Sequence, residues 1–182
     1  MKKIVLTYGL ISGAVIAALL FATLPFHDSI GFDYGHYVGY SEMLVAFLLV
    51  FFGVRAYRDN VSDGHISFLR ALAVGLLITL VSIICYVVAW EIAFYNFLPD
   101  FADKYTAYLI EKERNSGASA EKLAATLEQM KYMKTILENP FWFALIAFIE
   151  PLPVGLPISL ISAIILRKKP RSQTTEQQPA VV

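Results

Sequence analysis

The sequence predicts an all-α fold: a bundle of four transmembrane helices with an amphipathic helical hairpin outside the membrane, between the third and fourth spans. Hydrophobic residues make up 57% of the 182 residues, whereas about 45–50% is usual for a globular domain. The excess gathers in four blocks, at residues 4–26, 37–54, about 71–98 and 141–166. Each block is long enough to cross a hydrocarbon core of roughly 30 Å. Fifteen basic and fifteen acidic residues cancel, so no global field favours nucleic acid or an acidic substrate.

The first block follows Lys2 and Lys3 and contains 23 residues without a charge. A secretory signal peptide is the alternative, because such a peptide also joins basic residues to an apolar run. This run is longer than the usual h-region of about 7–15 residues, and no small-x-small cleavage site closes it. A retained span is therefore expected. Gly9, Gly13 and Ala17 recur every fourth residue, a spacing that lets another helix approach closely.

Residues 25–41 are predicted to be a solvated loop, because Gly31 and Gly35 suggest a flexible segment between the first two blocks. Two histidines and two aspartates in this segment could bind a metal ion: His27, Asp28, Asp33 and His36. Their spacing fits no recognised ligand pattern, so no metal site is predicted.

The second and third blocks each carry one carboxylate. Glu42 lies near the start of the second block and shares a helical face with Ala46 and Gly53, so we expect it to point at a neighbouring helix. Glu91 directly follows the charge-free run 71–90. It falls opposite the small-residue stripe of that helix, which consists of Ala71, Gly75 and Thr79. Glu91 therefore either faces a different neighbour or reaches the headgroups beside an aromatic belt.

Residues 99–139 form the one substantial polar segment, which predicts two helices with Gly117 between them. The first is expected from about Pro99 to Asn115, with acidic residues in its first turn. Ser119 is predicted to cap the second, whose apolar stripe has helical spacing: Leu123, Leu127, Met130, Met133 and Leu137. We expect this stripe to lie against the bundle or the membrane surface; binding of a partner is the alternative.

The fourth block begins with Asn139 and Pro140, a helix cap and a first-turn proline. Its one ionisable residue is Glu150, roughly 13 Å below the start of the block at about 1.5 Å per residue. A helix break is expected directly after Glu150, because proline lacks an N–H and clashes with the carbonyl four residues back; the breaking residues are Pro151, Pro153, Gly155 and Pro157. Small residues recur every four positions: Ala147, Pro151, Gly155, Ser159 and Ala163.

A carboxylate beside a broken helix at mid-membrane depth is the best candidate site in the chain. Ionisable residues inside a membrane are costly and commonly functional, and broken helices often build sites at the midplane. Glu150 is the leading candidate, and Glu42 and Glu91 are the other polar positions in the membrane. No catalytic residue is predicted.

Basic residues indicate that both termini lie in the cytoplasm, because cytoplasmic loops are rich in Lys and Arg. Nine lie in short segments on one side of the predicted spans, namely Lys2, Lys3, Arg55, Arg58, Arg70, Arg167, Lys168, Lys169 and Arg171. The first loop on the other side has none, so residues 99–139 are expected outside. Residues 1–171 are predicted to be a single integral membrane domain, and residues 172–182 a disordered cytoplasmic tail.

Six short segments resemble a known family in their order and spacing. They are residues 8–13 (YGLISG), 42–43 (EM), 55–59 (RAYRD), 64–68 (GHISF), 96–101 (NFLPDF) and 158–163 (ISLISA). Together they resemble the bacterial domain-of-unknown-function family numbered 4199. The resemblance implies a small four-span protein of the bacterial inner membrane with an outside helical insert. It implies no established activity, and so no catalytic residue.

An enzyme is not expected, because the sequence contains neither H-E-x-x-H nor G-x-S-x-G. No cofactor is predicted, and the lone Cys85 is expected to be a small core side chain. The expected function is a non-enzymatic assembly or accessory role, in which the protein packs with itself or with a membrane protein partner in the lipid bilayer. The alternative is a small transporter, or a proton- or cation-coupled membrane component, that uses Glu150.

Overall fold

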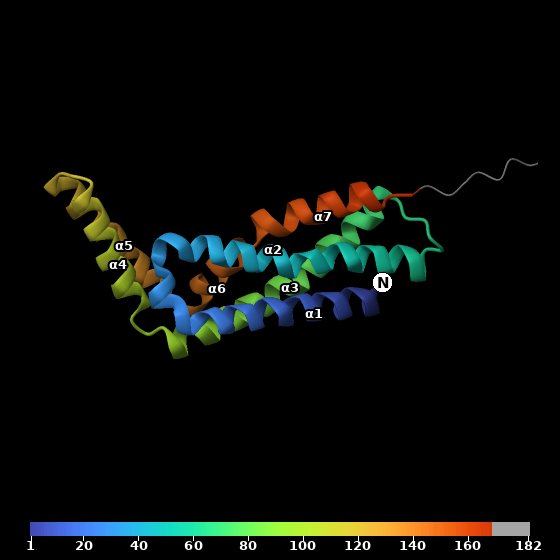
Figure 1. The fold of residues 1–182 in the computed structure, drawn as a ribbon, viewed down its shortest axis with the longest axis horizontal. Helices are drawn as coiled ribbons and strands as arrows, with labels where there is room; N and C mark the ends of the chain where they lie inside the picture. Colours follow the sequence, from blue (N-terminus) through green and yellow to red (C-terminus); the bar gives the residue numbers. More distant parts are fainter. Residues whose placement is uncertain (169–182) are drawn as a thin grey trace, which may run out of the picture.

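The computed structural model describes residues 1–168, which form helices joined by short connections (Figure 1). The helices are α1 (Lys2–Thr23), the 3-10 helix η1 (Leu24–Phe26), α2 (His27–Val61), α3 (Phe68–Phe97), α4 (Phe101–Asn115), α5 (Ala120–Leu137), α6 (Pro140–Ile149) and α7 (Leu152–Leu166). The all-α prediction is confirmed for this part of the chain. The tail predicted at residues 172–182 lies outside the described residues.

Three continuous helical stretches are long and apolar enough to cross a membrane: Lys2–Val61, Phe68–Phe97 and Pro140–Leu166. The first stretch folds back on itself, because α1 and α2 lie against each other and η1 joins them. α1, α2, α3 and the α6–α7 pair form one elongated bundle (Figure 1). α4 and α5 extend from one end of this bundle, and the N-terminus lies at the other end.

The predicted loop at residues 25–41 is wrong, because η1 and α2 continue the helical path through it. α2 already begins at His27 and extends to Val61 rather than Val54. Gly31 forms a kink inside it, with φ of 70° and ψ of 167°, a conformation that glycine tolerates because it has no Cβ. Composition favoured a loop, whereas the packing of Phe32 against aromatic rings of α4 keeps this segment helical.

Small residues hold the helices of the bundle at close range, as their spacing predicts. Ser82 on α3 donates a hydrogen bond to the Gly9 carbonyl of α1 (3.2 Å). A Cβ on residue 9 would lie 2.6 Å from the Cβ of Val81, so only glycine allows this approach. Between α3 and α7, Thr79 and Ser159 share a buried hydrogen bond of 3.0 Å. The predicted small-residue positions of α6 and α7 are buried: Ala147, Pro151, Gly155, Ser159 and Ala163.

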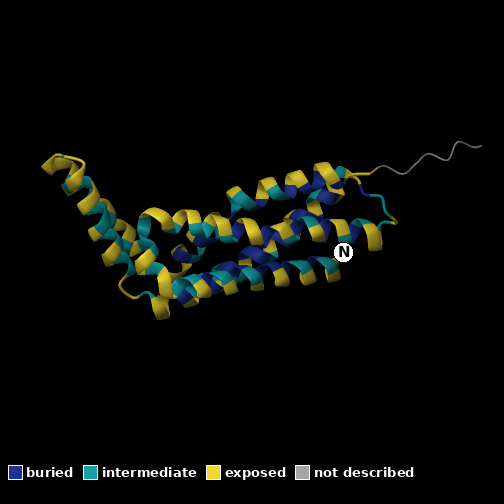
Figure 2. Cartoon of the chain, viewed as in Figure 1, coloured by how far each residue is buried: buried dark blue, intermediate teal, exposed yellow. Residues whose placement is uncertain are grey.

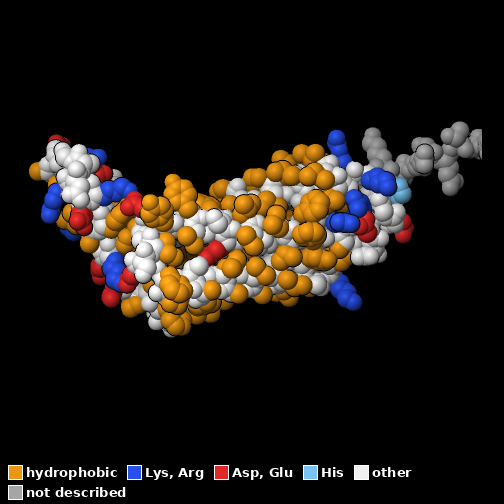
Figure 3. All heavy atoms as spheres, in the orientation of Figure 1, with side chains coloured by type: hydrophobic (Ala, Val, Ile, Leu, Met, Phe, Trp, Pro, Cys, Tyr) orange, Lys and Arg blue, Asp and Glu red, His pale blue; other side chains and the backbone are white. Residues whose placement is uncertain are grey.

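The loop between α2 and α3 and the end of α7 meet at the end of the bundle that also holds the N-terminus (Figure 1). Asp63 and Gly64 turn the chain within this loop, and both residues have positive φ. Ile66 and Lys168 exchange two backbone hydrogen bonds, of 3.0 and 2.9 Å. Figure 3 shows Lys and Arg side chains around this end and mainly hydrophobic side chains along the shaft of the bundle.

α4 and α5 lie antiparallel, and the pair is called the arm below. Lys134 near the end of α5 forms an ion pair with Asp103 at the start of α4 (2.6 Å). Lys122 at the start of α5 pairs with Glu113 near the end of α4 (2.6 Å). These two contacts join opposite ends of the two helices, which makes the arm a paired unit.

Two residues of the α5 stripe are exposed in the structure and do not pack against the bundle. Leu127 is 41% exposed and Met133 is 37% exposed, and Figure 2 shows much exposed surface along the arm. α4 makes the aromatic contacts with the bundle, since Phe101 packs against Phe94 of α3 and Phe32 of α2. Because α4 takes this position, part of the α5 stripe remains open.

Candidate functional site

Glu150 lies where the helix breaks between α6 and α7. Its N–H donates to the Ile146 carbonyl (3.1 Å) and closes the last turn of α6. The next helix starts after Pro151, whose carbonyl accepts from the Gly155 N–H (2.9 Å). The regular α-helix is interrupted only at Glu150 and Pro151, which both keep right-handed helical φ and ψ, and α7 runs from Leu152 to Leu166 through the other two prolines.

The carboxylate of Glu150 binds a residue that the sequence did not single out. The Tyr86 hydroxyl on α3 donates to Oε2 of Glu150 at 2.7 Å. Tyr86 is 4% exposed, and a buried phenol usually finds a hydrogen-bond partner. The only sequence signal for this hydrogen bond was the presence of Tyr86, with its polar hydroxyl, inside the charge-free run 71–90.

Glu42 lies on the face of α2 that turns towards the bundle, as predicted. Its Oε1 atom is buried, and within residues 1–168 it has no hydrogen-bond partner. Thr23 of α1 is close to this carboxyl, but its hydroxyl contacts two carbonyls of its own helix, each at 3.1 Å. The Glu42 carboxyl also lies within electrostatic range of the Tyr86 phenol. Glu42 therefore belongs to the same polar region as Glu150. Figure 3 shows an acidic side chain within the mainly hydrophobic shaft of the bundle.

Glu91 lies apart from this region. It is half-buried near the end of α3 and interacts with Tyr95, one turn further along. The Tyr95 hydroxyl donates to the Leu137 carbonyl at the end of α5 (2.9 Å), so Glu91 sits close to the base of the arm. The structure thus joins Glu150 to Tyr86, places Glu42 near them, and does not add Glu91.

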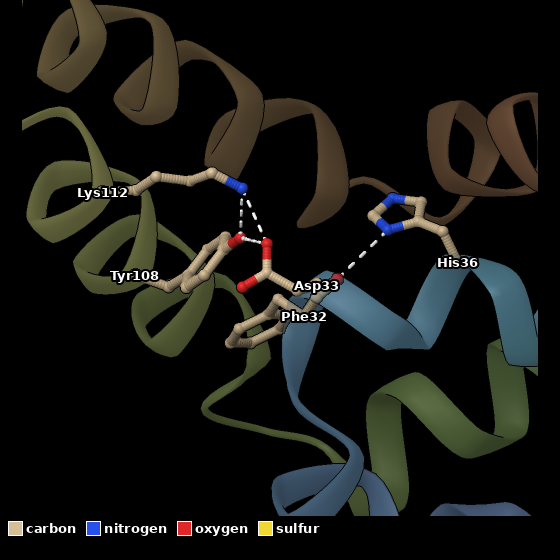
Figure 4. Close-up of polar contacts among 5 residues, drawn as sticks. All are labelled: Phe32, Asp33, His36, Tyr108 and Lys112. Carbon is tan, nitrogen blue, oxygen red and sulfur yellow. Dashed lines mark hydrogen bonds and ion pairs between the residues drawn. The ribbon is translucent and has the colours of Figure 1, made fainter. Parts of the chain in front are cut away.

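A second polar cluster joins the start of α2 to α4 (Figure 4). Asp33 accepts hydrogen bonds from Lys112 (2.7 Å) and from Tyr108. Asp28 pairs with Lys104 at 3.0 Å. The hydrogen bonds from these lysines lower the pKa of both aspartates below their usual value. The two aspartates considered as metal ligands are therefore partners of lysine side chains.

The two histidines of this segment do not gather around a common centre with the aspartates. Nδ1 of His36 lies 3.2 Å from the Phe32 carbonyl (Figure 4), and the ring of His27 packs edge-on against the ring of Phe32. Among the residues that the structure describes, no three His, Cys, Asp or Glu side chains form a group that could hold a metal ion. The cluster is a joint between α2 and α4, held by charge and by aromatic contacts.

Comparison with known proteins identifies the family of this fold. The model of a family described as "protein of unknown function (DUF4199)" matches residues 7–168, a range that includes nearly all of the bundle and the whole arm. No curated protein and no solved structure matches the chain. Because the family model covers well over half of the sequence, the chain belongs to the DUF4199 family.

Proposed function

We propose that this chain is a non-enzymatic, four-span protein of the bacterial inner membrane that serves as an assembly or accessory protein. α1, α2, α3 and the α6–α7 pair would supply the four spans. Both termini would face the cytoplasm, since the basic residues outside the arm gather at the end formed by the N-terminus and the α2–α3 loop. The arm would then lie on the outer side of the membrane.

The open apolar stripe on the arm is the observation that carries the assembly role. Leu127 and Met133 of this stripe are 41% and 37% exposed, and exposed apolar residues that lie together on a protein surface commonly mark interaction sites. All five lysines of the arm already have acidic partners: Lys104 with Asp28, Lys112 with Asp33, Lys122 with Glu113, Lys131 with Glu128, and Lys134 with Asp103. A surface neutralised in this way suits a protein partner better than anionic lipid headgroups.

Photo-crosslinking from the arm tests this role. A photoreactive amino acid at Leu127 should crosslink to protein in intact membranes, because this side chain is part of the open stripe. The matched control is Glu121, which is exposed on the same helix and lies about 120° from both Leu127 and Met133 at 100° per residue. A crosslink from Leu127 to a second copy or to another membrane protein, with none from Glu121, supports the proposal. Equal crosslinking from both positions, crosslinking to lipid, or no product would overturn it.

The second candidate function is a small transporter or a proton- or cation-coupled component. The hydrogen bond from Tyr86 to Glu150 at the helix break favours it, because discontinuous helices in transporters commonly present ionisable groups at midplane sites. We rank it second, since the Glu150 carboxylate has a structural partner on α3, which also suits a packing role.

A further inference from the structure

Three helices of the bundle meet at one level that can serve as a reference for depth. Phe47 on α2 and Thr79 on α3 both face Gly155 on α7. A Cβ on Gly155 would lie 3.3 Å from the Phe47 ring and 2.5 Å from Cγ2 of Thr79. The three residues are therefore in mutual contact range across the core of the bundle.

The polar region lies at one depth beyond this level, towards the arm. Glu42 precedes Phe47 by five positions, Glu150 precedes Gly155 by five, and Tyr86 follows Thr79 by seven. At about 1.5 Å per residue, these offsets correspond to roughly 7.5, 7.5 and 10.5 Å. α2 and the α6–α7 pair run from the arm end towards the N-terminal end and α3 runs the other way, so all three offsets point towards the arm. Two carboxyl groups and a phenol thus share one layer of the bundle.

No basic side chain of the bundle helices can neutralise this layer. Residues 4–54, 71–103 and 140–166 contain no Lys or Arg. The titratable groups that face the layer are Tyr40 and Glu42 from α2, Tyr86 from α3 and Glu150 from the end of α6, and α1 contributes the hydroxyl of Thr23. A negative charge in this layer therefore has no cation beside it to offset the loss of its hydration, which disfavours the charged form of a buried carboxyl.

The hydrogen bonds identify which carboxyl takes the proton. Tyr86 has one hydroxyl proton and directs it at Oε2 of Glu150, which stabilises a charge on Glu150. Oε1 of Glu42 is buried and receives no donor within the described residues. An ionised oxygen in that position would lose its hydration without compensation, whereas a neutral carboxyl loses much less.

We propose that Glu42, Tyr86 and Glu150 form a proton-binding site in the outward half of the bundle, with one proton bound to the Glu42 carboxyl at neutral pH. Glu150 remains the acceptor of the Tyr86 hydroxyl. The step is a simple association of a proton with a carboxylate oxygen, without any redox partner. The inference rests on the membrane-embedded bundle of the proposed function, but it requires neither a docking partner nor transport.

Infrared spectroscopy of the purified full-length chain in lipid bilayers tests the site. At pH 7 the wild type should show the carbonyl band of one protonated carboxyl, and this band should disappear as the pH is raised. Glu42→Gln should abolish the band, while Glu91→Gln, the control outside the site, should retain it. If Glu42→Gln fails to fold, Glu42→Asp serves instead, because a retained carboxyl with a different side chain should move the band rather than remove it.

Three results would overturn the proposal. One is the absence of a protonated-carboxyl band in the wild type at pH 7. Another is a band that stays unchanged in both Glu42 variants. The last is loss of the band when sodium ions are added at constant pH, which would assign the site to a metal cation. None of these readings depends on the orientation of the protein or on the arm, so failure here is distinguishable from failure of the crosslinking experiment.

Discussion

A methyl group of Thr79 sets how closely α3 and α7 can approach. Its hydroxyl shares a buried hydrogen bond with Ser159, which fixes the side chain, and its Cγ2 then occupies the space beside Gly155. Interhelical hydrogen bonds of this kind are worth about 0.6–2 kcal/mol in membranes. The contact therefore leaves little room for relaxation, because rotating Thr79 away would break the bond to Ser159.

Replacing Gly155 by Ala should destabilise the bundle by about 1–3 kcal/mol, as expected for overpacking. The new Cβ would lie 2.5 Å from Cγ2 of Thr79. Thermal unfolding in detergent measures the effect as a lower Tm. Gly39→Ala is the matched control, because nothing lies within 4 Å of a Cβ at that helical position; it should be neutral or stabilise by about 0.5–1 kcal/mol.

A second substitution identifies the cause. Thr79→Ser keeps the hydroxyl that reaches Ser159 but removes Cγ2, so combining it with Gly155→Ala should recover most of the lost stability. If the double variant melts as early as Gly155→Ala alone, the clash with Thr79 is not the source of the destabilisation.

The arm is the element whose position depends most on surface charge. Its α4 helix is held to the start of α2 by Asp28 with Lys104 and Asp33 with Lys112, and by the ring of Phe32 against those of Tyr105 and Tyr108. The aspartates have a lowered pKa in the folded protein. A carboxylate of this kind stabilises the joint at pH values above its unfolded pKa, and the contribution disappears as the pH falls through its folded pKa.

The joint should therefore loosen in acid, as the pH falls below the ordinary aspartate value of 3.8. Spin labels at Ser116 on the arm and Tyr40 on α2 would report this as a broader distance distribution. The double variant Asp28→Asn with Asp33→Asn should show the broad distribution already at neutral pH. Asp103→Asn is the control, because Asp103 pairs with Lys134 inside the arm. A narrow distribution in the double variant would mean that the aromatic contacts alone hold the arm.

Local sequence rules predicted the element ends well, because each rule involves neighbouring residues only. Ser119 and Asn139 accept the expected capping hydrogen bonds from backbone N–H groups, and Gly117 lies between α4 and α5 as expected, with positive φ. The predicted loop at residues 25–41 failed for the opposite reason, since the helical state of that segment depends on contacts with α4, more than 60 residues away.

The candidate site was predictable only in part, for the same reason. Helical periodicity placed Glu42 on an inward face, and proline chemistry placed a break beside Glu150, because both effects act within one helix. The hydrogen bond from Tyr86 spans 64 positions, and a single helical face does not show which residue of another helix lies at the same depth. Only the structure shows which residues of different helices lie at the same depth in the bundle.

For the whole molecule, orientation in the membrane is the property to test first. With Cys85 replaced by Ala to remove the one cysteine, single cysteines at Asn60 and Ser116 occupy exposed positions at opposite ends of the molecule. A membrane-impermeant maleimide added to intact cells should label Ser116→Cys and should reach Asn60→Cys only after the membrane is opened. Labelling of Asn60→Cys in intact cells would reverse the proposed orientation.

The backbone bridge between Ile66 and Lys168 has a consequence for how the chain is assembled during synthesis. The ribosome releases Ile66 about a hundred residues before Lys168, and both strands of the bridge are needed for its two hydrogen bonds. The pairing of α1 with α3 through Gly9 and Ser82 requires only the earlier helices. α1, α2 and α3 can therefore associate while the arm is still being translated, and α7 is the last helix to enter. The two backbone hydrogen bonds between Ile66 and Lys168 can form only after α7 has been synthesised, so the α2–α3 loop is the last part of this end of the bundle to be held in place.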